Sequence, residues 1–218
     1  MKKIVVFAAI ILCTGSLFAQ QRMEISVFTE PQLSWLSSDE GAVTNSGNIL
    51  HLNTGIAFDF FFMKNYAFSA GFSLNNAGGK MLYNDSISFV QAFDTLGIPR
   101  GTLLKHNLQY LSVPLGLKLK SEEMGFTTFY FHGGFVPMLN INAKTSSDVL
   151  GIDRENIKPE INFFNFNYFL EAGIEYRLAG NTAVVAGLKW SSGFTDITRN
   201  DRASNNLNTA GLHLGIIF

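Results

Sequence analysis

Residues 164–178 read FNFNYFLEAGIEYRL and alternate between two kinds of side chain. The even positions are aromatic or aliphatic, whereas most odd positions carry an amide, a carboxylate or a guanidinium. A period of two predicts a β-strand, because successive side chains of a strand point to opposite faces. The run is longer than a usual globular strand. Its apolar face is buried if the sheet is soluble and turned toward lipid if the sheet is a membrane barrel.

Seven further segments alternate in the same way, and no apolar run after the first nineteen residues is long enough for a membrane-spanning helix. A chain without such a helix can cross a membrane only as a closed barrel. The eight segments are residues 23–35, 50–62, 66–76, 110–120, 127–141, 164–178, 182–192 and 208–218. An even number of such strands is typical of bacterial outer-membrane barrels.

The connections between the segments are short and long in strict alternation. Three tight turns follow residues 62, 120 and 178, and the long polar loops are residues 36–49, 77–103, 142–160 and 193–207. Membrane barrels have short periplasmic turns and long outer loops. The sequence therefore predicts an all-β fold: an eight-stranded antiparallel up-and-down transmembrane β-barrel with short periplasmic turns and long extracellular loops.

The first residues resemble an export signal. Lys2 and Lys3 precede the apolar run IVVFAAIILCTGSLFA, which predicts a signal peptide over residues 1–19 and a barrel domain over residues 20–218. A lipoprotein signal at Cys13 is the alternative, but Leu12 stands where such signals need a small residue. Cleavage removes two lysines and the only cysteine, so the formal charge of −1 becomes −3. Thiol chemistry and disulfides are thereby excluded, and there is no basic excess for nucleic acid.

Aromatic residues suggest which face is outside. Trp35, Phe164, Phe166 and Trp190 fall near the predicted outer rim, and other aromatic residues fall near the inner rim. Such girdles are typical of a lipid-facing surface. The interior of an eight-stranded barrel has room only for side chains. We expect a paired, hydrogen-bonded polar network there that plugs the barrel and leaves no open pore. Its predicted members are Glu24, Glu30, Asp59, Lys118, Glu171, Glu175, Arg177 and Lys189.

Two features depart from a regular strand pattern. Pro31, Pro114 and Pro137 each delete a ladder hydrogen bond within a predicted strand. Leu104 and Leu108 lie on the even face, but the odd face is apolar from Leu111 onward. Either a bulge near Gln109 resets the strand, or the residues before Tyr110 stand above the membrane.

No cofactor or metal site is expected from the sequence. A hydrolase can be imagined from Ser112 and His132, which face inward on neighbouring strands, but no oxyanion motif accompanies them. Asp39 and Glu40 are typical of a solvated loop tip.

The loop 77–103 is unusually apolar, and its segment SISFVQAF favours a small hairpin or helix. We expect this loop either to bind a protein partner or to fold over the barrel mouth. Its candidate residues are Ile87, Phe89, Val90, Phe93, Leu96 and Ile98.

Two short motifs carry a resemblance to a known family. YLSVPLGLKLK (110–120) and GFTDI (193–197) resemble segments of PorT-like outer-membrane β-barrel proteins of Bacteroidetes-type bacteria, and GLHLGIIF (211–218) ends in an aromatic residue as those proteins do. The resemblance covers roughly residues 23–218. It implies an outer-membrane location and no common enzymatic activity. It also implies a C-terminal strand, with Leu214, Ile216 and Phe218, that is read by the outer-membrane assembly machinery.

Three hypotheses follow for function. The first is a monomeric structural or interaction protein in outer-membrane lipid, acting through its extracellular loops and associated with secretion or surface machinery. The second is a lipid-modifying hydrolase that uses Ser112 and His132. The third is a soluble barrel that carries a hydrophobic ligand, which requires the apolar faces to point inward.

Overall fold

A computed structural model describes residues 22–38, 43–84, 87–90, 95–147, 149–198 and 205–218. The predicted signal peptide, Asp39, Glu40 and Phe93 lie outside the described residues. The elements are β1 (Met23–Ser38), β2 (Val43–Gly47), β3 (Ile49–Met63), β4 (Tyr66–Tyr83), β5 (Ile87–Val90), β6 (Thr95–Ile98), β7 (Thr102–Ser112), β8 (Leu115–Lys120), β9 (Thr127–Ser147), β10 (Ile152–Asn156), the 3₁₀ turn η2 (Lys158–Glu160), β11 (Phe164–Ala179), β12 (Thr182–Gly193) and β13 (Asn205–Ile217). Among the described residues no helix is long and apolar enough to cross a membrane.

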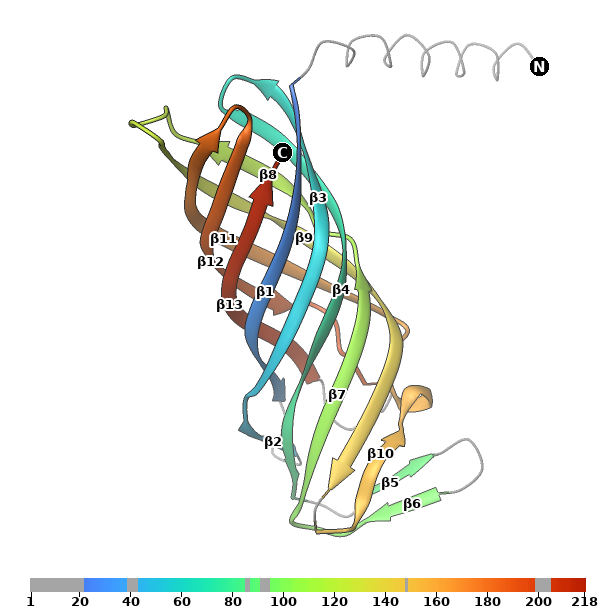
Figure 1. Ribbon diagram of the computed structural model, residues 1–218. Helices are drawn as coiled ribbons and strands as arrows, with labels where there is room; N and C mark the ends of the chain where they lie inside the picture. Colours follow the sequence, from blue (N-terminus) through green and yellow to red (C-terminus); the bar gives the residue numbers. More distant parts are fainter. Residues whose placement is uncertain (1–21, 39–42, 85–86, 91–94, 148, 199–204) are drawn as a thin grey trace, which may run out of the picture.

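The strands form one closed antiparallel barrel (Figure 1). Neighbours follow the order β1, β3, β4, β7 with β8, β9, β11, β12 and β13, and β13 pairs back onto β1. The elements β7 and β8 are two halves of one barrel strand, interrupted at Val113 and Pro114. The described part of the barrel therefore has eight strands around its circumference. This confirms the predicted fold.

The apolar faces of the strands point outward along most of the barrel. Leu50 is 71% exposed and Leu188 is 68% exposed, and many other large apolar side chains are exposed on the same belt. On this belt the rings of Phe135 and Phe194 both stack on the ring of Phe166. A soluble protein rarely exposes so much contiguous apolar surface. The arrangement contradicts the soluble carrier, which needs these side chains inside.

The structure accommodates the three prolines of the predicted strands in two ways. Pro114 lies in the break between β7 and β8, where its carbonyl accepts the Gly71 amide at 3.0 Å. Pro31 and Pro137 remain in the ladders, opposite Leu52 and Phe166, at positions facing away from the interior. Each proline therefore removes a donor without breaking the closed sheet.

The barrel continues well beyond the predicted strand ends, and its interior there holds an apolar core among buried polar side chains. The strand β4 runs to Tyr83 and β9 runs to Ser147, which leaves residues 84–101 as the second long loop. The buried apolar side chains in this half are Leu36, Ala77, Met81, Tyr83, Leu104, Leu108, Tyr110, Val136, Met138, Ala143, Ile157, Ile161, Phe169, Ile197 and Leu207. The expected polar interior is therefore only part of the filling: beyond the apolar belt the strands also enclose apolar side chains, which lie between buried polar ones such as His106, Thr145 and Asn165.

The second of the two explanations offered for the irregular strand fits the structure. The even side chains of β7 point inward all the way from Thr102 to Ser112, so Leu104 and Leu108 belong to the apolar core beyond the belt. The β7–β9 register also shifts between Gln109 and Tyr110, which pair with Asn142 and Asn140 and leave Ile141 as an extra residue. The bulge therefore lies in β9 and does not reset β7.

The chain around η2 covers the end of the barrel that carries the long loops. Ile157 donates its amide to the Ala143 carbonyl, and Ile161 forms a bridge with Thr198. Ile157, Ile161 and Ile197 are buried beneath this cover. Residues 157–161 and 194–198 thus cover the barrel interior at this end. Residues 87–90 and 95–98 pair as the strands β5 and β6, and β5 lies beside η2.

Candidate functional site in the barrel interior

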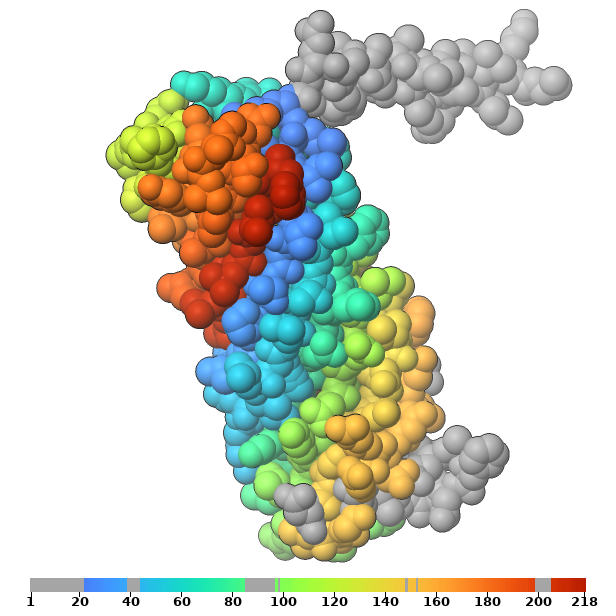
Figure 2. All heavy atoms as spheres, in the orientation of Figure 1, coloured from blue at the N-terminus to red at the C-terminus, as the bar shows by residue number. Residues whose placement is uncertain are grey.

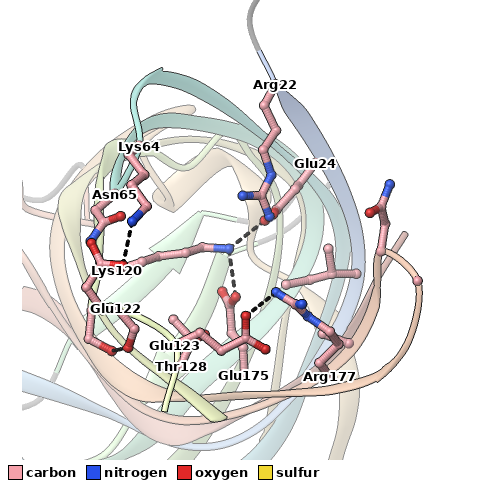
Figure 3. A pocket seen from close by; sticks show the side chains of 15 residues that line it. Arg22, Glu24, Lys64, Asn65, Lys120, Glu122, Glu123, Thr128, Glu175 and Arg177 are labelled. Carbon is pink, nitrogen blue, oxygen red and sulfur yellow. Dashed lines mark hydrogen bonds and ion pairs between the residues drawn. The ribbon is translucent and has the colours of Figure 1, made fainter. Parts of the chain in front are cut away.

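Charged side chains form a continuous column at the end of the barrel that carries Met23 and the C-terminus. The Lys120 side chain extends across the lumen, and its ammonium lies 2.5 Å from Glu24 and 2.6 Å from Glu175 (Figure 3). Arg22 pairs with the second oxygen of Glu24. Lys120 comes from β8, Glu24 from β1 and Glu175 from β11. One ammonium group therefore links three strands of the barrel.

Lys118 continues the column toward the middle of the barrel. It precedes Lys120 by two residues on β8, so both side chains point inward. Its ammonium lies 2.9 Å from both Asp59 and Glu175. Acid and base therefore alternate along the column. Buried charges cost stability unless they are paired and hydrogen-bonded, and each charge here has an opposite neighbour.

A second cluster lies beyond the column. Glu30 is 2.7 Å from Lys189 and 2.7 Å from His213, and it also accepts a 2.6 Å hydrogen bond from Asn53. Glu171 lies 3.7 Å from His213. Each of Glu30, Glu171 and His213 offers a ligand atom within 4.8 Å of the others, the spacing of a metal site. The Lys189 ammonium already supplies positive charge beside Glu30, so we assign no metal to the cluster.

Tyr130 ties Glu171 into the wall of the barrel. Its hydroxyl donates a 2.7 Å hydrogen bond to Glu171. The ring fits because Gly173 and Gly187 have no side chains: a Cβ on Gly173 would lie 2.8 Å from the Tyr130 hydroxyl, and one on Gly187 would lie closer still. The glycines of these strands thus give space to a buried hydrogen-bonded phenol.

The structure places seven of the eight predicted network residues in the interior. Arg177 is the exception, because it lies at the mouth with its side chain 49% exposed and pairs with Glu123 of the turn before β9. Alternation put Arg177 on the inward face, but β11 has already reached the rim at this point. The network also includes residues that the prediction omitted: Arg22, Asn53, Lys120, Tyr130, His132 and His213. Lys120 could have been found, since it shares the inward face with Lys118.

The short turns around this mouth carry their own exposed ion pair. Lys64 lies 2.7 Å from Glu122, and Asn65 donates a second hydrogen bond to that carboxylate at 3.2 Å. The hydrogen bond from Lys64, with that from Asn65, lowers the pKa of Glu122. The pair links the β3–β4 turn to the segment after β8.

The structure does not assemble the proposed Ser112–His132 pair. Ser112 is in register with Met138 of β9, six residues from His132, which corresponds to roughly 20 Å along the strand. His132 instead lies between Lys118 and Glu171 in register, with its ring 4.7 Å from that of Phe169. The sequence placed both side chains on inward faces correctly, but their separation along the barrel axis depends on strand register.

A closed barrel with an apolar outer belt and a charged, filled interior defines an integral outer-membrane barrel protein. Residues 18–199 match the family model described as outer membrane protein beta-barrel domain, and the chain belongs to this family. In such proteins the short turns face the periplasm. The charged column therefore lies at the periplasmic end, and the apolar core lies at the extracellular end.

Solved structures of outer-membrane proteins are similar to this chain. The protease OmpT from Escherichia coli is 8% identical with a TM-score of 0.51, and the match covers 91% of this chain and 96% of OmpT. Neisserial surface protein A is 11% identical, with coverage of 89% and 95% and a TM-score of 0.47. The attachment invasion locus protein Ail of Yersinia pestis is 16% identical, with coverage of 89% and 98% and a TM-score of 0.43. No curated protein matches the chain.

Proposed function

We propose that this chain is a PorT-like outer-membrane barrel that does not conduct solutes and acts by presenting its extracellular end to a protein partner. The observation that carries the proposal is the filled interior. Solutes entering from the periplasm meet the paired charges of Lys120 and Lys118, and the apolar core lies beyond them. With no route through the barrel, the remaining surface for function is outside the membrane.

The extracellular end is built as a firm platform, which supports a role in presentation. Asp196 accepts hydrogen bonds from the amides of Thr198 and Asn205 at 2.8 and 2.9 Å and from the Thr198 hydroxyl at 2.8 Å. The side chain of Asn162 donates to the carbonyls of Asp196 and Thr198 at 2.9 Å. Asp196 belongs to the GFTDI motif that carries the PorT-like resemblance. The motif thus fastens the cover of the barrel.

The β5–β6 hairpin extends from this platform and is the proposed partner site. It forms its own two-stranded sheet, separate from the barrel sheet (Figure 1). The sequence of the hairpin is rich in apolar residues, and exposed apolar segments on rigid scaffolds often bind partners. We therefore place the interaction at residues 87–98.

Photo-crosslinking in living cells tests the proposal. A photoreactive amino acid at Gly97 fits, because the Gly97 position is exposed and nothing lies within 4 Å of an added Cβ. The same amino acid at Asn181, which is exposed in the β11–β12 turn, is the matched control. We expect a discrete protein adduct at Gly97 that is absent at Asn181 and is lost when residues 87–98 are replaced by a Gly-Ser linker. Identical adduct patterns at both positions would contradict the proposal.

A further inference from the structure

Three lysines lie close together on the outer wall of the barrel. Lys80 of β4 is directly opposite Lys105 of β7. Lys144 of β9 is opposite Asn107, two residues along from Lys105. All three occupy outward positions of adjacent strands, which are about 4.8 Å apart. This wall is the lower half of the surface in Figure 2, where the green and yellow strands run side by side.

The lysines have no acidic partner on these strands. None of the three forms an ion pair among the described residues. The other described outward residues beyond the apolar belt on these strands are Asn76, Gly78, Leu82, Leu103, Asn107, Gln109, Asn142 and Ser146, with no carboxylate. Like charges directly opposite each other on a sheet are destabilising. An anionic ligand would remove this repulsion.

The wall is also hollowed. One groove of about 680 Å³ is lined by the three lysines together with Asn107 and Ser146. A second groove of about 500 Å³ adjoins it and shares Lys105, Asn107 and Lys144. Asp153 and Arg154 also line the first groove and add one negative and one positive charge to it. The grooves thus offer three ammonium groups flanked by amide and hydroxyl donors, which suits phosphate oxygens.

The height of the lysines above the belt identifies the occupant. The last apolar outward residues below them are Leu74, Leu111 and Ile141, which are three to six residues away along the strands. That separation is roughly 10–20 Å along a strand. Because barrel strands are tilted by about 40°, it corresponds to about 8–15 Å along the membrane normal. The headgroup zone of a phospholipid leaflet is only about 5–8 Å deep. Lys80 and Lys105 therefore stand above phospholipid phosphates, at the level of the sugars of a large glycolipid, and Lys144 stands at the upper edge of the headgroup zone.

We propose that Lys80, Lys105 and Lys144 bind the sugar-borne phosphates of lipopolysaccharide in the outer leaflet. The ligand lies against the barrel wall with its acyl chains on the apolar belt and its phosphorylated saccharide in the grooves. This site is independent of the β5–β6 hairpin, since it lies on the wall and uses no residue of residues 87–98. It anchors and orients the extracellular half of the barrel.

Binding of purified lipopolysaccharide to the folded protein in detergent tests the site. The test variant is Lys80→Gln/Lys105→Gln/Lys144→Gln, and the charge-retaining control is the triple Lys→Arg variant. Lys64→Gln, which removes an exposed lysine at the periplasmic turn, is the second control. We expect the triple Gln variant to bind at least about tenfold more weakly, and the two controls to bind like the wild type. A gel-mobility shift on boiling verifies that each variant is folded.

The probes separate the possible anions. The same lipopolysaccharide after enzymatic dephosphorylation, phosphatidylglycerol and a soluble sulfated polysaccharide are compared with the intact glycolipid. We expect the intact glycolipid to bind most tightly and to lose affinity as salt concentration rises. Equal binding by the triple Gln variant, or wild-type binding to phosphatidylglycerol or to the sulfated polysaccharide as tight as to the intact glycolipid, would overturn the proposal.

Discussion

The Lys118 ammonium lies 2.9 Å from the Asp59 carboxylate across the interior of the barrel, and the two side chains are only 8% and 4% exposed. Asp59 is also in register with Glu24, so without Lys118 and Lys120 two carboxylates would face each other on adjacent strands. The cations of β8 therefore hold together the acidic side chains of β1, β3 and β11.

Breaking this pair should destabilise the barrel strongly. Lys118→Met leaves Asp59 without its cation and leaves Glu175 paired with Lys120 alone. We expect a loss of about 3–5 kcal/mol in the free energy of unfolding. The double variant Lys118→Met/Asp59→Asn should recover part of that loss. Urea titration in lipid vesicles, followed by gel mobility, measures both. Lys64→Met, which breaks an exposed pair, is the control and should have a clearly smaller effect.

The glycines around Tyr130 should tolerate no side chain. Gly187→Ala places a methyl group against the Tyr130 hydroxyl, and we expect a loss of about 1–3 kcal/mol from overpacking. Tyr130→Phe in the same chain relieves the contact, so the double variant should lose less than the sum of the two single losses. Additive losses in the same urea titration would mean that Tyr130 is not the group in contact.

The apolar core at the extracellular end should contribute to stability. Leu104→Ala removes a fully buried side chain, and we expect a cost of about 2–5 kcal/mol. Leu111→Ala is the matched control, because Leu111 lies on the same strand but is 38% exposed on the outer face. If both substitutions had the same small effect, the extracellular half would not enclose a packed core.

The fastening of the cover by Asp196 can be tested separately. Asp196→Ala removes the acceptor for two amides and one hydroxyl, at a cost of about 1–3 kcal/mol that is confined to the cover. Hydrogen exchange should accelerate at the amides of Thr198 and Asn205 and remain unchanged in β12. Faster exchange spread over β12 as well would indicate that the cover and the barrel open together.

Alternation predicted the barrel correctly because a period of two determines which side chains share a face. It did not predict where along the strands the apolar side chains change from the outward to the inward face. Leu104 and Leu108 alternate just as the lower strands do, but past the belt the apolar side faces inward. The sequence shows this change, because Leu104 and Leu108 are apolar on the even face whereas the odd face is apolar from Leu111 onward. The pairing with the neighbouring strands is needed to interpret it.

The interior charges were predictable individually but not in their pairing. Lys118, Glu171 and Glu175 could be placed inside from their own strands. Their partners come from strands far apart in the sequence, and those contacts depend on register and tilt. For the same reason the Ser112–His132 pair failed: both residues face inward, but register separates them along the barrel.

Single-channel conductance in planar lipid bilayers tests the central claim, a barrel closed by its own side chains. The folded wild-type protein should give no stable conductance steps. A variant with Lys118→Ala, Lys120→Ala, Leu104→Ala and Leu108→Ala, which thins both the charged column and the apolar core, should give measurable leak events if it folds, and Leu111→Ala should remain silent. Steady, uniform conductance by the wild type would contradict the claim, because ions would then cross an interior that the structure fills.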